Sequence, residues 1–502
     1  PTVQGVSLRG IGASGASRSL VLLDGLPLND PFGGWVYWGR APRLAVERLE
    51  VLRGGSSDLY GSGALGGVAQ ILTRSAGAGR GLDAELSAGS SNFFDGAVTA
   101  HASGERWGGQ VSAEALRTDG HLAVDPWDRG SIDRPVASRH AALDATVERR
   151  FDRGGKAFVR GMYYDESRDN GTPLQENDTW IGLLAAGYDQ GPWSARLWGS
   201  RQELRQSFSA VASDREAERL VRRQRVPADA LGASGQWSRT AGSRHHLVAG
   251  VEGRLVRGAT HETGYFGGGP SSELEAGGEQ LSGGAFLEDR VQVHPRWLLT
   301  ATGRFDAWSQ REGRTSLTRL SDPANPVESA FPSRTETAFS PRLGVLFRAS
   351  DTLSFSGAGY GAFRGPTLNE LYRGFRVGST VTLANPTLTA ERLWGGEVGA
   401  LFSSGPLALR VTVFDAEVRD AVANVTLEVT ENLVTRQRQN VGRVRSTGLE
   451  VEGEARLGAR TSITGGYTLI DSRVTSFASD PSLEGSALPH IPRHQAVLQA
   501  AS

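Results

Sequence analysis

The connections between strand-like segments alternate in length along most of this chain, and this alternation constrains the fold more than any other feature. From Gly81 onward, apolar and polar residues alternate, so that Leu82 and Leu86 share one face of a strand and Asp83 and Glu85 share the other. Similar segments of about ten residues recur to the end of the chain, and this is the length of a tilted membrane strand.

Short connections separate every second pair of segments, and long polar connections separate the others. The short turns are Gly104–Arg106, Asp152–Gly155, Gln190–Pro192, Thr240–Arg244, His294–Arg296, Ser350–Asp351, Ser403–Pro406 and Gly458–Arg460. The long loops are Thr118–Arg139, Ser167–Asp178, Gly258–Gly278, Glu312–Glu336, Arg364–Ala390, Arg419–Gln439 and Thr475–Arg493. Short turns at one end and long loops at the other are typical of an up-and-down outer-membrane β-barrel.

Three tryptophans support a membrane location for this barrel. Trp107, Trp193 and Trp297 each follow or close a short turn, which predicts one aromatic girdle at one membrane interface. The mean hydropathy of −0.30 resembles that of a soluble protein, but a barrel needs only its outward face to be apolar. We count roughly 18 strand-like segments and expect a large antiparallel barrel of the roughly 22-stranded class, whose lumen is plugged.

Composition argues against several other classes of protein. The formal net charge of −1 disfavours a nucleic-acid-binding protein. The basic run Arg219–Arg225 is better interpreted as a solvated barrel segment that touches anionic outer-leaflet lipid. The chain has no cysteine, which excludes disulfides and thiolate metal sites.

Neither a catalytic site nor a metal site is expected. None of the nine histidines forms a His-Glu-x-x-His pattern, and His245 and His246 are adjacent in a turn. The Gly/Ser cluster Gly12–Ser17 matches neither a nucleophile elbow nor a phosphate-binding loop. Glu450 and Glu452 share one strand face and could act as general acid and base, but a polar barrel lumen predicts the same pair. We therefore expect no enzyme activity, no metal and no cofactor.

The segment from Val46 to Arg74, VERLEVLRGGSSDLYGSGALGGVAQILTR, predicts a strand, a glycine-rich turn and a second strand. Alternation gives the first strand one buried face, which carries Leu49 and Val51. This segment resembles the plug signature of TonB-dependent outer-membrane transporters, close to "VERIEVLRGP-SALYG--A-GGVINIIT". The one departure is Gly55, where that signature has proline.

Other segments resemble the same family in the same order. SLRGIG and SLVLLDGLPL, near the start, are similar to the plug motifs "IRG-G" and "VLIDGVPL-D". In the barrel, FRGPTLNELY at Phe363–Tyr372, NPTLTAE at Asn385–Glu391 and NVGRVRSTGLEVE at Asn440–Glu452 are similar to "FRAPTL-ELY", "NP-LKPE" and "N-G-A--GVE-E". The resemblance therefore covers nearly all of the chain.

The resemblance implies an all-β membrane protein with a small mixed α/β plug at residues 1–80, inside a transmembrane barrel at residues 81–502. It implies active uptake of a scarce, large solute, such as an iron chelate (siderophore) or cobalamin, across the outer membrane of a Gram-negative-type bacterium. The expected partners are the TonB energy-transducing complex, which pulls on an N-terminal plug segment, and outer-membrane lipid or lipopolysaccharide. We interpret the chain as a fragment without its signal peptide, that segment and the last barrel strands.

Two other functions remain open at this point. A passive porin-like channel would share the barrel but should lack the plug motifs. A soluble all-β carbohydrate-binding protein should lack the alternation of short and long connections. The substrate itself cannot be named from the sequence.

Two groups of aromatic and basic residues are candidates for substrate binding. The loop NDPFGGWVYWGR carries four aromatic side chains that form either a local core or an exposed apex of the plug, and the resemblance favours the apex. We expect this apex to face the extracellular vestibule together with residues of one long barrel loop. The candidates are Phe32, Trp35, Tyr37, Trp38, Tyr372, Arg373, Phe375 and Arg376.

Four charged residues are candidates for a contact that locks the plug to the barrel. Arg9 and Arg53 each precede a glycine, which allows another surface to come close. Alternation along their strands places Glu397 and Glu450 on the inward face of the barrel. In the family that the chain resembles, arginines of these plug motifs meet glutamates of these two strands, so the resemblance implies one cluster of all four.

Overall fold

The computed structural model describes residues 4–12, 17–74, 79–377, 379–431, 433–458 and 460–502. Residues 13–16 of the Gly/Ser cluster Gly12–Ser17 and one residue of the turn Gly458–Arg460 lie outside this described part. No helix among the described residues is long and apolar enough to cross a membrane.

The N-terminal segment forms a small sheet with the strand order β2-β1-β4-β3. Its strands are β1 (Ser19–Leu23), β2 (Leu26–Pro27), β3 (Val46–Arg53) and β4 (Gly67–Thr73). β1 runs parallel to β4, while β2 and β3 are antiparallel to their neighbours. Short helices connect the strands: η1 (Trp38–Arg40), η2 (Arg43–Ala45) and α1 (Ser57–Tyr60). The mixed plug that the sequence predicted is therefore present.

The predicted buried face of β3 is wrong. Leu49 and Val51 are 58% and 43% exposed, although both lie on the face that was expected to be covered. β3 is an edge strand whose ladder joins it to β4 alone among the described strands, so its faces gain little cover from the rest of the sheet. Alternation indicates which residues share a face, but it does not show what covers that face.

The remaining chain forms one antiparallel sheet wound into a barrel. Among the described residues its wall has 18 strands, in agreement with the count expected from the sequence. The first nine are β5 (Gly79–Gly89), β6 (Phe93–Ser103), β7 (Trp107–Thr118), β8 (Ser138–Arg150), β9 (Lys156–Asp169), β10 (Glu176–Gln190), β11 (Trp193–Val211), β12 (Glu218–Ala241) and β13 (His245–Phe266). The others are β14 (Gly269–His294), β15 (Trp297–Arg319), β17 (Arg334–Arg348), β18 (Leu353–Arg364), β21 (Glu391–Ser404), β22 (Leu407–Val429), β23 (Val434–Arg456), β24 (Ser462–Phe477) and β25 (His494–Ala501).

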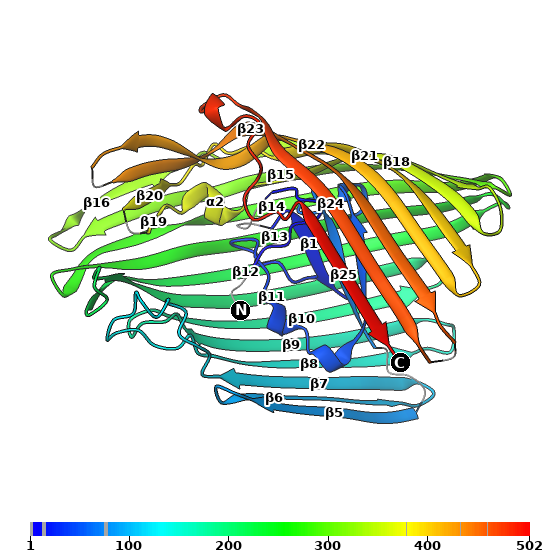
Figure 1. Ribbon diagram of the computed structural model, residues 1–502, viewed down its shortest axis with the longest axis horizontal. Coiled ribbons are helices and arrows are strands. Elements are labelled where there is room, and N and C mark those ends of the chain that lie inside the picture. The colour runs from blue at the N-terminus through cyan, green and yellow to red at the C-terminus, as the bar shows by residue number, and fades with distance from the viewer. Residues whose placement is uncertain (1–3, 13–16, 75–78, 378, 432, 459) are drawn as a thin grey trace.

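Smaller elements lie in the long connections on one side of the barrel. They are β16 (Asp322–Ala330), α2 (Leu368–Tyr372), β19 (Phe375–Val377), β20 (Thr380–Leu383) and η3 (Pro481–Leu483). β16 folds back on the outer part of β15, and β20 pairs with β23. In Figure 1 these additions gather at the left, and the short turns lie at the right.

The alternation of short and long connections is confirmed, but three of the predicted loops are wrong. Glu312–Glu336 contains the end of β15 and the whole of β16, which pair with each other. The ladder between β13 and β14 continues to Phe266 and Gly269, so Gly258–Gly278 is mostly a long hairpin. The region Arg419–Gln439 likewise contains the paired ends of β22 and β23. Backbone hydrogen bonds form in water as well as in lipid, so the strands continue beyond the apolar band that the sequence pattern revealed.

The outward face carries the predicted apolar band and tryptophans. Trp107, Trp193 and Trp297 are each the first residue of a strand after a short turn, and they are 56%, 62% and 41% exposed. Leu82 and Leu86, which were expected to share one strand face, are both exposed on this outer face. An outward apolar band that ends in an aromatic girdle at a membrane interface is typical of membrane barrels.

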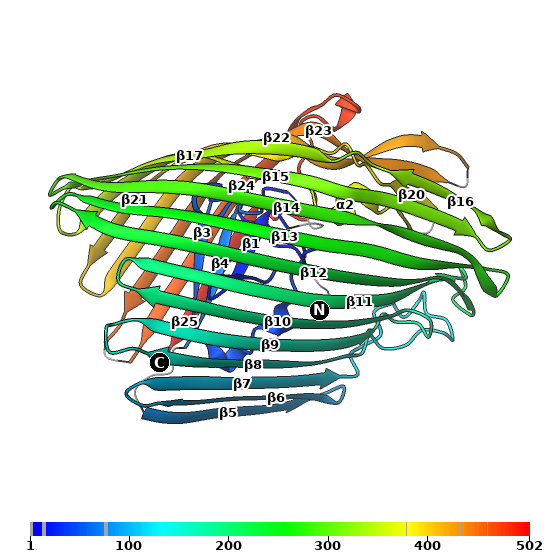
Figure 2. The same ribbon diagram turned by 180° about the vertical axis from the view of Figure 1, so that it is seen from behind.

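The plug lies inside the barrel (Figures 1 and 2). Val21 and Leu23 of β1 are fully buried and share one hydrophobic cluster with Met162 of β9 and Leu183 of β10. A second cluster joins Ile11 of the plug to Tyr360 of β18. The plug therefore packs on opposite parts of the inner wall and fills the middle of the lumen.

Candidate functional site

Arg9 forms the centre of a buried cluster of charges between the plug and the barrel. Its Nη1 lies 2.5 Å from Glu397 Oε2, and its Nε and Nη2 donate to Glu450 Oε1 and Oε2 at 3.3 and 2.9 Å. The guanidinium also lies 4.5 Å from the centre of the Phe414 ring. Arg9 is only 6% exposed. The planar guanidinium fork can serve two carboxylates at once, as this site requires.

Local backbone geometry brings Arg9 to the wall. Arg9 and Gly10 both have positive φ, and a Cβ at Gly10 would lie only 2.9 Å from Ile470 Cγ2. The carbonyl oxygens of Arg9 and Gly10 accept hydrogen bonds from Ser446 and Ser472. A larger residue at position 10 would therefore push the turn away from the wall.

Arg53 belongs to the same cluster, but its main partner was not predicted. Its Nη1 is 3.5 Å from Glu450 Oε2, and its Nη2 is 2.5 Å from Glu452 Oε1. Glu397, the other glutamate of the predicted cluster, is the partner of Arg9. The sequence signal for Glu452 was present, because Glu450 and Glu452 share the inward face of β23, but only the register of the barrel decides which acid meets Arg53.

A second ion-pair chain, missed by the sequence analysis, links the plug to the extracellular loop. Arg18 Nη2 is 2.6 Å from Glu391 Oε1, and Arg364 Nε is 2.6 Å from Glu391 Oε2. Arg364 also donates two hydrogen bonds of 2.9 Å to Glu370 in α2. Glu391 is fully buried. The four residues therefore connect the plug, β18, β21 and α2 in one network.

The short helix α2 is fixed by a capping box. Thr367 accepts a hydrogen bond from the Glu370 backbone, and the Glu370 carboxylate accepts one from the Thr367 backbone. Burial works against ionisation of Glu370, but the Arg364 guanidinium nevertheless holds the pKa of this carboxyl below its usual range. The spacing Thr-x-x-Glu was visible in the sequence and could have indicated this turn.

Further ion pairs hold the plug at other points around the wall. Asp24, at the tip of the β1–β2 hairpin, is 2.5 Å from Arg160 of β9. Asp58 of α1 is 3.1 Å from Arg342 of β17. Arg43 lies 2.5 Å from Glu85 of β5 and 2.8 Å from Asp95 of β6. The block in the lumen is therefore fastened on several sides.

The expectation of an exposed aromatic apex is wrong for Phe32 and Tyr37. Phe32 is fully buried against Leu368 and Leu371 of α2, and its carbonyl oxygen accepts a 3.0 Å hydrogen bond from Asn369. Tyr37 is 1% exposed, and its ring centre lies 6.2 Å from that of Tyr164 on β9. Aromatic rings gain more by packing between the plug and the barrel than by facing solvent, so both residues belong to a core shared by the two domains rather than to an exposed apex or a local core of the loop.

The other two aromatic residues of this loop are more accessible. Trp35 is half-buried and packs beside the clusters that contain Phe32 and Tyr37. Trp38 is 45% exposed at the start of η1, which lies against β8 and β9. Only Trp38 presents a large aromatic surface to solvent at this apex.

The predicted loop residues also divide into buried and accessible groups. Tyr372 is 3% exposed and stacks on Phe331 at 5.6 Å, which contradicts its expected position in the vestibule. Phe375 lies between the guanidinium groups of Arg373 and Arg438, at 5.7 and 5.2 Å. Arg376 is exposed on β19.

Positive charge is in excess at this mouth of the lumen. Arg373 and Arg222 both contact the Glu262 carboxylate, at 3.0 and 2.8 Å. Arg438 donates to the carbonyl oxygens at the end of α2 rather than to a carboxylate. Two guanidinium groups therefore share the Glu262 carboxylate, and Arg438 adds a third guanidinium group at this mouth, which makes it attractive to an anionic solute.

A cavity of about 790 Å³ lies between the plug and the wall formed by β11 to β15. Its plug side includes Leu22 and Asp30, and its wall side includes Arg254 and Ser282. The segment Arg364–Thr367, just before α2, lines its extracellular end. On β13 the lining runs from His246 to Val256, which corresponds to roughly 33 Å of strand.

Two family models match the chain. "TonB-dependent Receptor Plug Domain" covers residues 1–68, and "TonB dependent receptor-like, beta-barrel" covers residues 107–502.

Individual relatives are more distant. The probable TonB-dependent receptor BfrD of Bordetella pertussis is 26% identical over 206 residues, which cover 41% of this chain and 26% of BfrD. The metal-pseudopaline receptor CntO of Pseudomonas aeruginosa strain PAO1 is 23% identical, with 92% of this chain and 68% of CntO covered. The crystal structure of the ferric yersiniabactin uptake receptor FyuA from Yersinia pestis superimposes with a TM-score of 0.76 at 16% identity, with 99% of this chain and 76% of that chain covered.

Proposed function

This chain belongs to the TonB-dependent receptor family, and we propose that it takes up a scarce, large solute across the outer membrane of a Gram-negative-type bacterium. The observation that carries this proposal is the plug, which fills the lumen and is fastened to the wall by buried ion pairs. Breaking one such pair costs several kcal/mol, so the block does not open by thermal motion alone. Work from outside, delivered through the TonB energy-transducing complex, is the source that this family provides.

The solute passes through the cavity between the plug and β11 to β15. This cavity already extends along β13 from the end next to the short turn to the middle of the strand, so transport needs a movement at its extracellular end rather than ejection of the whole plug. The segment Arg364–Thr367 and α2 form the gate at that end. The Arg18–Glu391–Arg364 chain holds this gate closed and connects it to the plug.

The solute is an anionic metal chelate of the siderophore type. The excess of guanidinium groups near Glu262 supports this assignment, and so do the metal chelates named in the descriptions of CntO and FyuA. Of the binding residues expected from the sequence, Trp35, Trp38, Arg373, Phe375 and Arg376 keep this role. Cobalamin is the alternative member of the substrate class.

Uptake by cells that express the protein tests this function. Radiolabelled iron chelates and cobalamin are supplied to cells with and without TonB. We expect saturable uptake of one solute that is lost without TonB. Uptake that persists without TonB would instead support a passive porin-like channel.

The route can be tested separately, because the chain has no cysteine and any introduced thiol is unique. Ser282 on the inward face of β14 lines the cavity, whereas Ser356 of β18 is exposed and lies outside the cavity lining. A bulky thiol reagent on Ser282→Cys should block uptake, and Ser356→Cys is the matched control. Undiminished uptake after complete labelling at position 282 would exclude this route.

A further inference from the structure

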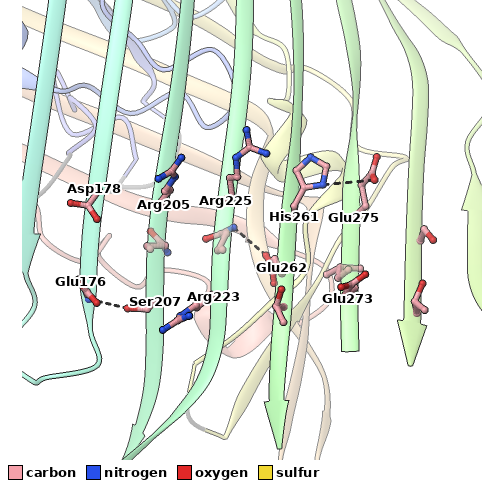
Figure 3. Close-up of a pocket in the computed structure, with 16 residues that line it drawn as sticks. Glu176, Asp178, Arg205, Ser207, Arg223, Arg225, His261, Glu262, Glu273 and Glu275 are labelled. Carbon is pink, nitrogen blue, oxygen red and sulfur yellow. Dashed lines mark hydrogen bonds and ion pairs between the residues drawn. The ribbon is translucent and has the colours of Figure 1, made fainter. Parts of the chain in front are cut away.

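A second hollow, of about 660 Å³, lies on the outer wall of the barrel rather than in the lumen (Figure 3). The labelled side chains of Arg205, Arg225, His261 and Glu275 come from four successive strands, β11 to β14. Cross-strand pairing joins Arg205 to Arg225, Arg225 to His261 and His261 to Glu275, so these residues share one face.

That face is the outward one. On β11 and β12 the same face carries Leu197 and Leu231, which are 55% and 52% exposed. The opposite face carries Leu204 and Val226, which are buried against the interior cluster around Phe32. The basic run Arg219–Arg225 is therefore divided: Arg223 and Arg225 point outward, whereas Arg222 contacts the inward Glu262.

The hollow lies at the height of the outer-leaflet headgroups. Trp193 marks the membrane interface next to the short turns. From Trp193 to Arg205 the strand extends roughly 40 Å, which gives about 28 Å of height at a tilt of about 45°. The hydrocarbon core of a bilayer is about 30 Å thick. Outward apolar residues end at Leu197 on this strand, and Arg201, Glu203 and Arg205 follow on the same face.

The arginines of the hollow are only partly neutralised. Arg205 and Arg225 are both 2.6 Å from Glu203, so one carboxylate serves two guanidinium groups. Arg223 lies over the Tyr265 ring at 5.9 Å and pairs with no carboxylate in the described part of the chain. Arg205 and Arg225 have side chains that are 65% and 55% exposed, so their remaining donors are accessible from the membrane side.

Acidic side chains flank the arginines on both sides of the hollow. Glu176 and Asp178 of β10 lie on one side, where Asp178 is the cross-strand neighbour of Arg205. Glu273 and Glu275 of β14 lie on the other side, and Glu275 is paired with Arg314 at 2.6 Å. A ligand that fits both the arginines and the acidic flanks carries phosphate together with an amine or a bound divalent cation. Guanidinium forks bind phosphate in a bidentate manner, and arginines near an anionic membrane surface each contribute to lipid binding.

We propose that this outer-wall hollow binds the phosphorylated headgroup of an outer-leaflet lipid, with Arg205, Arg223 and Arg225 on the phosphate. The site rests on the proposed outer-membrane location but not on transport. It would keep one lipid at a fixed position beside the long hairpins that extend from β12 to β15.

Lipid binding by the purified protein in detergent tests the proposal. Phosphorylated lipid A, dephosphorylated lipid A and inorganic phosphate are titrated against the protein, the variant Arg205→Gln/Arg223→Gln/Arg225→Gln and a control. The control is Arg419→Gln/Arg445→Gln, which removes two outward arginines of β22 and β23 that each have their own carboxylate. Lysine at positions 205 and 225 provides a variant that keeps the charge but not the fork.

We expect phosphorylated lipid A to bind at least about tenfold more tightly than the dephosphorylated form, and the triple variant to lose roughly this factor. The control should bind like the unmodified protein, and the lysine variant should lie between them. Equal binding of the two lipids, or an unchanged triple variant, overturns the proposal. Displacement of the lipid by equimolar inorganic phosphate would assign the hollow to a free anion instead. Unchanged solute uptake in the triple variant would leave the transport proposal intact, so the two can fail separately.

Discussion

Arg9 of the plug donates two hydrogen bonds to the two carboxylate oxygens of Glu450, while its third nitrogen contacts Glu397. The pair is almost fully enclosed, with side-chain exposures of 3% and 7%. A buried charge pair of this kind contributes little net stability, but the loss of one partner leaves the other charge without compensation. The contact therefore holds the plug to the barrel wall, and the loss of either partner costs free energy of plug docking.

Glu450→Gln should loosen the plug without unfolding the barrel. The substitution removes the bidentate acceptor of Arg9, and we expect a cost of about 3–5 kcal/mol in plug docking. The barrel ladder does not depend on this residue. Hydrogen exchange of the plug amides in detergent measures the effect, because local opening raises exchange only in the region that opens.

Glu452→Gln is the matched control for this experiment. It lies two residues away on the same strand face, but its side chain is 41% exposed. Exposed pairs contribute about 0–1 kcal/mol, so plug exchange should change little. Equal increases in plug hydrogen exchange for the two substitutions would show that burial of the ion pair does not determine its contribution to plug docking.

The charge reversal Glu397→Arg should loosen the plug, and the second substitution Arg9→Glu should restore docking, whereas Arg53→Glu should not, because Arg9 is the partner of Glu397.

The family resemblance predicted this cluster, and strand alternation supported it by placing both glutamates on the inward face. Glu397 and Glu450 were assigned to the lumen by their apolar neighbours, and the structure places both there. Alternation does not determine the height at which a plug residue meets the wall, which depends on the register of the barrel. Glu452 and Glu391 were therefore missed as partners of Arg53 and Arg18, although both residue types were visible.

The aromatic loop illustrates a different limit of the sequence. Its rings could form a core or an exposed apex, and nothing local distinguishes the two. The deciding element is α2, far away in the sequence, whose Leu368 and Leu371 cover Phe32. The long hairpins were underestimated for a related reason, since strands outside the membrane lose the apolar pattern but keep their backbone pairing.

Glu391→Gln should weaken the gate between the mouth and the cavity. Glu391 is fully buried and is the only link, among the described residues, through which Arg18 and Arg364 share a carboxylate. An amide keeps the shape but removes the carboxylate that pairs with Arg18 and leaves Arg364 with Glu370 alone, at a cost of about 3–5 kcal/mol. We expect larger ion conductance through the protein in planar bilayers.

Glu417→Gln serves as the control for the gate, because Glu417 pairs with Arg419 on the outward face of β22. Conductance of this variant should equal that of the unmodified protein. If the conductance of Glu391→Gln also equals that of the unmodified protein, the ion-pair chain does not close the passage.

An ion pair between two extracellular loops should give pH-dependent order outside the membrane. Arg215 donates to both carboxylate oxygens of Asp133, and these hydrogen bonds lower the pKa of Asp133 to about 2. A pKa below the unfolded value of about 3.9 stabilises the folded loops above that value. The stabilisation is lost as the pH falls through about 2. Limited proteolysis by pepsin between pH 4 and pH 2 should therefore cleave this loop faster as the pH decreases.

Asp133→Asn removes the charge and should make the loop susceptible to pepsin throughout this pH range. Pepsin activity itself depends on pH, so the variant and the unmodified protein must be compared at the same cleavage sites within this loop. A variant whose cleavage follows the same pH profile as the unmodified protein would contradict a role for this pair.

Phe32 and Trp38 should separate stability from substrate binding within one loop. Phe32→Ala empties a buried site beneath α2, where a Cβ at Gly258 would lie 2.8 Å from the Phe32 ring. A large-to-small change in such a site costs about 3–5 kcal/mol, so we expect a looser plug and a looser α2, measured by hydrogen exchange.

Trp38 is 45% exposed, and Trp38→Ala should leave hydrogen exchange of the plug unchanged while it lowers solute affinity. Aromatic anchors at binding sites typically contribute about 2 kcal/mol or more, which corresponds to roughly a 30-fold loss of affinity. If Trp38→Ala binds the solute as tightly as the unmodified protein, the apex has no part in recognition and the arginines near Glu262 must provide it.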